Sequence, residues 1–165
     1  METWTPTRVE AGLSTWLAPH FGWTPTYKGE PTPWPERVAS AAFDGVCSPG
    51  VLIDHIAPRE PGEAAAFWAW VEARGRERGG VAILIGNRYH GRHAPGVLER
   101  FPAARVYAAE KVYGVVNVPV TDCVVEGTVG PAGIVALLVE NMGDLEVAWH
   151  VPSARALFFS DAVHG

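Results

Sequence analysis

The sequence lacks the features that mark several classes of protein. None of its 165 residues belongs to an apolar run near the roughly 18 residues that cross a membrane. It has no dense Lys and Arg cluster of the kind that binds nucleic acid, and 18 acidic against 13 basic residues give a net charge of −5. Its start has no basic segment followed by an apolar stretch, as a signal peptide has. We therefore expect a cytoplasmic protein with neither a membrane nor a nucleic acid as partner.

Cysteine and standard catalytic signatures are also scarce. The two cysteines, Cys47 and Cys123, are far apart and form no C-x-x-C pair, so we expect two buried thiols, with a disulfide as the alternative. The chain has no phosphate-binding G-x-x-x-x-G-K-[ST], no dinucleotide-binding G-x-G-x-x-G and no G-x-S-x-G nucleophile motif. What it does have is 48% hydrophobic and 10% aromatic residues, which is typical of a globular domain with a substantial core.

The chain divides by pattern into an arm and one domain. Residues 1–36 hold four of the seven Trp and six of the 14 Pro with little periodicity, which predicts an irregular N-terminal arm. Residues 37–165 show regular patterns and form the predicted domain. Its first half alternates strands and helices, which predicts parallel pairing through crossovers. The predicted strands are 37–43, 51–54, 81–85 and 105–108, and the predicted helices are 60–78, ended by Gly79-Gly80, and 95–100.

The second half of the domain changes character. Four strand-like segments follow one another, separated by Gly, Pro and Asn turns with no convincing helix between them. This pattern predicts antiparallel hairpins, so the whole sheet is mixed and the fold class is α/β or α+β. The four segments are residues 121–125, 134–139, 146–151 and 156–160.

The densest polar cluster, residues 86–93, directly follows the predicted strand 81–85. Loops at the carboxyl ends of such strands converge on one crevice, where α/β proteins bind their ligands. His90 and His93 are three residues apart, a spacing that can point both imidazoles the same way for a metal ion. The alternative is that they are ordinary loop residues.

Two further strand ends carry polar groups. Asp54-His55 ends the strand 51–54, and the last predicted strand runs into Ser160, Asp161 and His164. If these ends lie beside the His90 loop, they supply oxygen and nitrogen ligands of the type that zinc, iron or manganese accept. For Asp54 a purely turn-forming role is an equal alternative.

The order of these elements and motifs resembles the metallo-β-lactamase-like hydrolase family. The resemblance covers residues 37–164 and implies an αββα-type mixed sheet with flanking helices, shortened at its C-terminus. In that family one strand ends in an aspartate, the next runs into an H-x-H-x-D-H metal loop, and a late strand ends in a Gly-Asp pair that bridges two metals. The matching segments here are residues 51–54, 88–93, 99–107 and 156–162.

The resemblance places arginines where the family has metal ligands. His90 and His93 match two histidines of the loop and Asp161 matches the bridging aspartate, but Arg88 replaces a histidine and Arg92 the loop aspartate. The family's next metal histidine is missing near residues 142–145, and the chain stops before the family's last elements. A guanidinium about 4 Å from a metal charge costs about 4 kcal/mol at an effective dielectric of about 20. A two-metal centre is therefore not expected.

Three hypotheses follow. The leading one is a metallo-β-lactamase-like protein with a degenerate metal centre and no efficient two-metal hydrolysis. The first alternative is a hydrolase with one zinc, iron or manganese ion on His90, His93 and Asp161, with a metal-bound water as nucleophile. The second is a binding or assembly module without metal, in which Arg88 and Arg92 hold a small anion. In the metal-bound case Asp54, His55 and His164 are candidates for an extra ligand or support. A homodimer is expected to cover the apolar surface that a shortened fold leaves.

Overall fold

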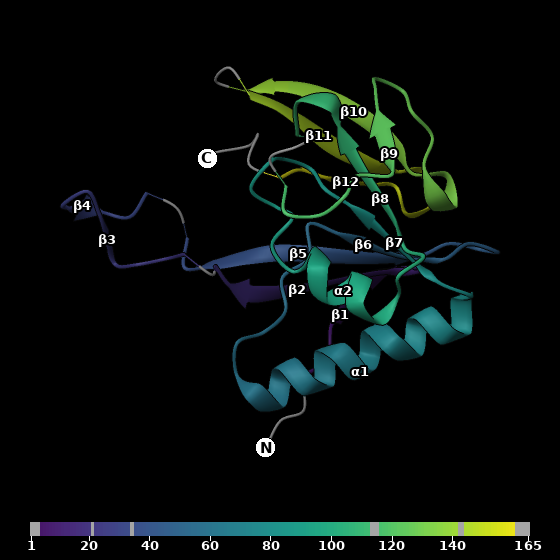
Figure 1. The fold of residues 1–165 in the computed structure, drawn as a ribbon, viewed down its shortest axis with the longest axis horizontal. Coiled ribbons are helices and arrows are strands. Elements are labelled where there is room, and N and C mark those ends of the chain that lie inside the picture. Colours follow the sequence, from purple (N-terminus) through teal and green to yellow (C-terminus); the bar gives the residue numbers. More distant parts are fainter. Residues whose placement is uncertain (1–3, 21, 34, 113–115, 142–143, 161–165) are drawn as a thin grey trace.

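The computed structural model describes residues 4–20, 22–33, 35–112, 116–141 and 144–160. They form three layers (Figure 1). Helices α1 (Pro61–Arg78) and α2 (Ala94–Arg100) lie on one face of a seven-stranded sheet, and a three-stranded sheet covers the other face. The predicted mixed α+β architecture is confirmed.

The seven-stranded sheet has the order β1-β2-β5-β6-β7-β8-β9. The strands from β1 to β6 pair antiparallel, and those from β6 to β9 pair parallel. The carboxyl ends of β6 and β7 therefore lie side by side, with Ile53 opposite Leu84. The bounds are β1 Thr7–Glu10, β2 Leu13–Pro19, β5 Arg37–Asp44, β6 Gly50–Ile53, β7 Val81–Leu84, β8 Arg105–Ala109 and β9 Asp122–Val124.

The predicted irregular arm is wrong for residues 7–19, which form β1 and β2. β2 pairs with β5 along its whole length, so the sheet continues across the predicted boundary at residue 37. Trp16 and Ala18 alternate inward and are buried, and the Trp16 indole donates a hydrogen bond to the carbonyl of Ile56 at 2.8 Å. Pro19 is the last residue of this strand and the other prolines of the arm lie outside it, so no proline interrupts its interior.

The prediction that residues 121–125 belong to an antiparallel hairpin is also wrong, because β9 pairs parallel to β8. The connection over residues 110–121 is long enough to return the chain to the same end of the sheet, which a parallel neighbour requires. The predicted hairpins are confirmed in the second sheet, in which β10 (Val135–Asn141), β11 (Asp144–Val151) and β12 (Ala156–Phe158) pair antiparallel. Its buried residues Val147 and Trp149 face the core.

The predicted helix 60–78 is confirmed as α1, and both of its ends carry residues that favour a helix terminus. Pro61 occupies its first turn, Arg76 and Arg78 its last turn, and Gly79 ends it in the left-handed conformation at φ 71°. Its buried face carries Phe67, which contacts a cluster of aromatic rings. The rings of this cluster are Trp4, Trp16, Phe67, Trp68 and Trp70.

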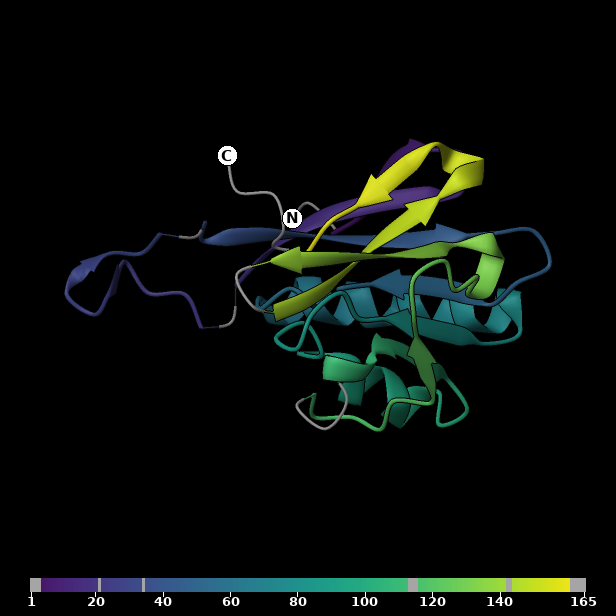
Figure 2. The same ribbon diagram turned by 90° about the horizontal axis from the view of Figure 1, so that it is seen from above.

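Three remaining features complete the fold. Between β2 and β5 the chain forms a small hairpin of β3 (Thr26–Tyr27) and β4 (Glu30–Pro31), which extends away from the body (Figure 2). Cys47 and Cys123 are free thiols, as expected, but both are exposed instead of buried. No helix in the described part of the chain is long and apolar enough to span a membrane.

Candidate functional site

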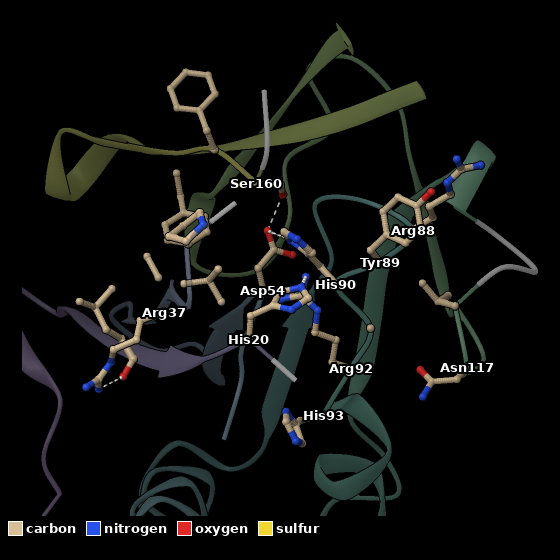
Figure 3. Close-up of a pocket in the computed structure, with 18 of the residues that line it drawn as sticks. His20, Arg37, Asp54, Arg88, Tyr89, His90, Arg92, His93, Asn117 and Ser160 are labelled. Atoms are coloured by element: carbon tan, nitrogen blue, oxygen red, sulfur yellow. Dashed lines mark hydrogen bonds and ion pairs between the residues drawn. The ribbon is translucent and has the colours of Figure 1, made fainter. Parts of the chain in front are cut away.

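Asp54 lies at the centre of the candidate site, directly after β6. Its backbone has a left-handed φ of 44°, and the residue is only 3% exposed. One carboxylate oxygen, Oδ1, accepts the Gly86 N–H at 2.6 Å, while Oδ2 accepts the Ser160 hydroxyl at 2.5 Å and lies 3.1 Å from His90 Nδ1 (Figure 3). The three predicted strand ends therefore converge, and Asp54 joins them.

Gly86 makes this convergence sterically feasible. A Cβ at this position would overlap the Ser160 hydroxyl and lie 2.6 Å from Asp54 Oδ2. The carbonyl of Gly86 accepts the Val147 N–H at 2.7 Å, which ties the end of β7 to β11 in the second sheet. The residue thus lets the two sheets approach each other over the carboxylate.

His90 has both ring nitrogens facing protein groups. The side-chain carbonyl of Asn87 accepts the Tyr89 N–H at 2.9 Å, so its amide nitrogen faces His90 Nε2 at 3.4 Å and Glu146 Oε1 at 3.4 Å. A donor facing Nε2 favours a lone pair on that atom and places the ring proton on Nδ1, toward Asp54. His90, 7% exposed, is therefore oriented by a chain of buried polar groups.

His93 and His55 are both held in their neutral forms. His93 Nδ1 accepts the Ala57 N–H at 3.2 Å, and burial together with Arg92 and Arg59 lowers the pKa of His93. His55 is fully buried, and desolvation lowers its pKa from 6.5 to about 4, although a hydrogen bond to the His93 backbone acts in the opposite direction. His55 lies near His93 and Asp54 but is not among the residues that line the pocket described below.

The described residues do not fit a metal centre. A metal-ligating histidine turns a lone pair to the ion and donates its other N–H to the protein. His93 has the opposite arrangement because its Nδ1 accepts a backbone N–H, and His90 Nε2 faces Asn87. Within the described ranges, no three His, Cys, Asp or Glu side chains are grouped closely enough to hold an ion. Asp161 and His164 lie outside the described residues.

His20 is a site residue that the sequence analysis did not select. Its Nε2 lies 3.2 Å from Arg92 Nη2, and its carbonyl accepts a hydrogen bond from Arg59 Nη2 at 2.8 Å. His20 directly follows β2, and the pairing of β2 with β5 carries it to the His90 loop. Because that stretch of sequence looked irregular, the only available signal was a lone histidine after an alternating segment.

Arg88 and Arg92 do not form one clamp. The guanidinium of Arg88 lies over the ring of Tyr89, 4.9 Å from its centre, and points away from Asp54. Arg92 instead reaches inward to His20 (Figure 3). The structure therefore places one of the two predicted anion-binding arginines at the centre of the site and the other at its margin.

These groups line a pocket of about 1110 Å³. Among the residues that the structure describes, the charged lining comprises Arg37, Arg88 and Arg92 and one acid, Asp54, in a chain whose net charge is −5. The rest of the lining is apolar, aromatic or neutral polar: Leu17, His20, Tyr27, Pro35, Val38, Ala39, Tyr89, His90, Gly91, His93, Val116, Asn117, Phe158, Phe159 and Ser160.

Comparison with known proteins adds no relative. A scan against models of protein families finds no match to the chain, and a search of curated proteins finds none either. The resemblance to the metallo-β-lactamase-like family thus stays a prediction from the sequence motifs.

Proposed function

We propose that this protein binds a small anionic ligand in the pocket beside Asp54, on a metallo-β-lactamase-like frame whose metal centre is degenerate. The frame is supported by the order of the elements. β6 runs into Asp54, β7 into the His90 loop and β12 into Ser160, the same order as the motifs of the family. The expected αββα arrangement has two helical layers, and the structure has one of them, on one face of the mixed sheet.

One observation carries the anion preference: the only carboxylate among the described lining residues already faces three donors. Asp54 accepts hydrogen bonds from the Gly86 N–H and the Ser160 O–H and lies 3.1 Å from His90 Nδ1, so protein groups stabilise its charge. Three arginines against this one carboxylate give the described part of the lining a positive balance. A partly buried positive pocket attracts an anion more strongly than solvent-exposed arginines do, because the effective dielectric is lower.

Removing the charge of Arg92 tests the proposal. Calorimetric titration with acetate and with inorganic phosphate at low salt measures binding by the parent protein and by Arg92→Gln. Loss of a charged hydrogen bond of about 1.5–3 kcal/mol predicts a roughly ten- to hundredfold weaker anion affinity. Arg76→Gln is the matched control, because Arg76 is exposed at the far end of α1 and should bind anions like the parent. Equal affinity in Arg92→Gln and the parent would contradict the proposal.

Metal content distinguishes this proposal from the single-metal hydrolase. The tautomer of His93 and the Asn87 amide that faces His90 Nε2 predict far less than one zinc, iron or manganese ion per chain in protein purified without chelator. Anion binding should then be unchanged after dialysis against a chelator. About one ion per chain, lost in His90→Ala or His93→Ala, would support the hydrolase instead.

A further inference from the structure

We infer that the ligand is an amphipathic monocarboxylate, with its head group at Arg92 and a linear apolar tail along β2 and β5. This inference rests on the proposed function and adds the class of ligand. It comes from the donors that meet around Arg92 and from the apolar side chains that line the pocket along β2 and β5.

The head-group end is the region around Arg92. Arg92 and His20 meet there, and the His93 ring carries its proton on Nε2 because Nδ1 accepts the Ala57 N–H. The guanidinium supplies charged donors and His93 a neutral one, which suits the two oxygens of a carboxylate. In Figure 3 Arg37 lies to one side of this cluster, and Arg88 and Asn117 lie to the other.

The head group that these donors suit carries two oxygens. Asp54 lines the same pocket, and a second negative charge on the ligand would double both its repulsion from Asp54 and its attraction to the arginines. Charge alone therefore does not select between a carboxylate and a phosphate. The preference for a carboxylate rests on the match between its two oxygens and the donors of Arg92 and His93.

The tail end is an apolar trough. β2 and β5 place Leu17 opposite Ala39, and Phe158 and Phe159 line the same pocket from the end of the second sheet. Arg37 borders this trough, and its guanidinium donates a hydrogen bond to the Leu17 carbonyl. Leu17 is 54% exposed and Phe159 38% exposed, so both offer apolar area that a ligand would remove from water. A pocket of about 1110 Å³ is also far larger than an inorganic anion needs.

A homologous series of ligands tests the inference. We would titrate the protein with acetate, butyrate, hexanoate and octanoate, and with octanol, octylamine and octyl phosphate. Affinity should rise up to about fourfold for each methylene, the change that full burial of a CH₂ produces. Octanoate should bind tighter than each of the other octyl compounds, because only octanoate combines the tail with the two-oxygen head group that the donors of Arg92 and His93 match.

Variants locate the tail. In Leu17→Ser and Phe159→Ser, the affinity should rise less for each added methylene than in the parent protein, while the affinity for acetate should stay the same. Leu157→Ser is the matched control, since Leu157 is 44% exposed on β12 but does not line the pocket, and its series should match that of the parent. Because all three side chains are substantially exposed, thermal unfolding should show folded protein in each case.

The outcomes separate the two proposals. Flat affinity along the series, with acetate binding that still requires Arg92, would overturn the amphipathic ligand and leave the anion pocket intact. Tighter binding of octyl phosphate would overturn the preference for a carboxylate, and equal binding of octanol or octylamine would overturn the anionic head group. An unchanged series in Leu17→Ser would overturn the tail position. No binding of any anion would refute both proposals.

Discussion

Asp54 combines two unfavourable features, a left-handed backbone and a buried charge. Asn tolerates the left-handed conformation as Asp does, whereas Ala does not, so substitutions separate the two features. Asp54→Asn should lower the free energy of unfolding by about 1–3 kcal/mol through loss of charge. Asp54→Ala should lower it by about 3–5 kcal/mol, because it also leaves the donors of Gly86, His90 and Ser160 without an acceptor.

Chemical denaturation measures both changes. Ser160→Ala is the comparison variant, and it should cost about 1 kcal/mol because it removes one donor and leaves the carboxylate in place. An Asp54→Ala protein as stable as Ser160→Ala would contradict the central role of this carboxylate.

His55 makes the stability of the protein depend on pH. Its pKa is about 4 in the folded state against 6.5 when unfolded, so the unfolded chain takes up a proton first as the pH falls. The stabilising contribution is complete above pH 6.5 and is lost between pH 6.5 and 4, by about 3 kcal/mol in total. His93, whose pKa is also lowered, adds to the loss in the same direction.

Urea unfolding at several pH values checks this dependence. His55→Leu should lose most of the decrease in stability below pH 6.5, whereas His150→Gln, on β11, should retain the decrease. A His55→Leu protein with the same pH dependence as the parent would show that the decrease comes from other groups.

At the scale of elements, Gly75 determines how closely α2 approaches α1. A Cβ at Gly75 would overlap the ring of Phe101, the residue that ends α2. Gly75→Ala should therefore destabilise the protein by about 1–3 kcal/mol, although alanine favours an isolated helix over glycine by about 1 kcal/mol. Gly62→Ala in the same helix meets no atom within 4 Å and should be neutral or stabilising. Thermal and chemical unfolding would show this difference in sign, and equal effects of the two substitutions would contradict the close approach.

The elements also show how far sequence patterns reach. Helix α1 was predicted because its apolar spacing, terminal charges and terminal glycines act within the helix itself. β2 was missed because the prolines in and around it suggested an irregular arm. Its partner β5 begins 18 residues after β2 ends, so no local pattern indicated the pairing. The direction of β9 was missed because a turn-rich segment is compatible with either a hairpin or a parallel return.

For the whole molecule, the expected homodimer stays a prediction. Its support is a set of large apolar side chains exposed outside the pocket, among them Val125, Val129 and Leu157. Light scattering on the eluting peak of a sizing column should give about twice the chain mass of 17.8 kDa. A single species of 17.8 kDa at the same concentration would contradict the prediction.

The sequence by itself determined the mixed α+β architecture, the bounds of α1 and the strand ends at Asp54 and in the His90 loop. These depend on local periodicity, caps and turns, which neighbouring residues specify. Only the tertiary structure decided that Asp54 joins His90 to Ser160 and that His20, not Arg88, lies beside Arg92. Those contacts join residues far apart in the chain, and they depend on strand pairing, sheet packing and side-chain orientation, which local patterns do not specify.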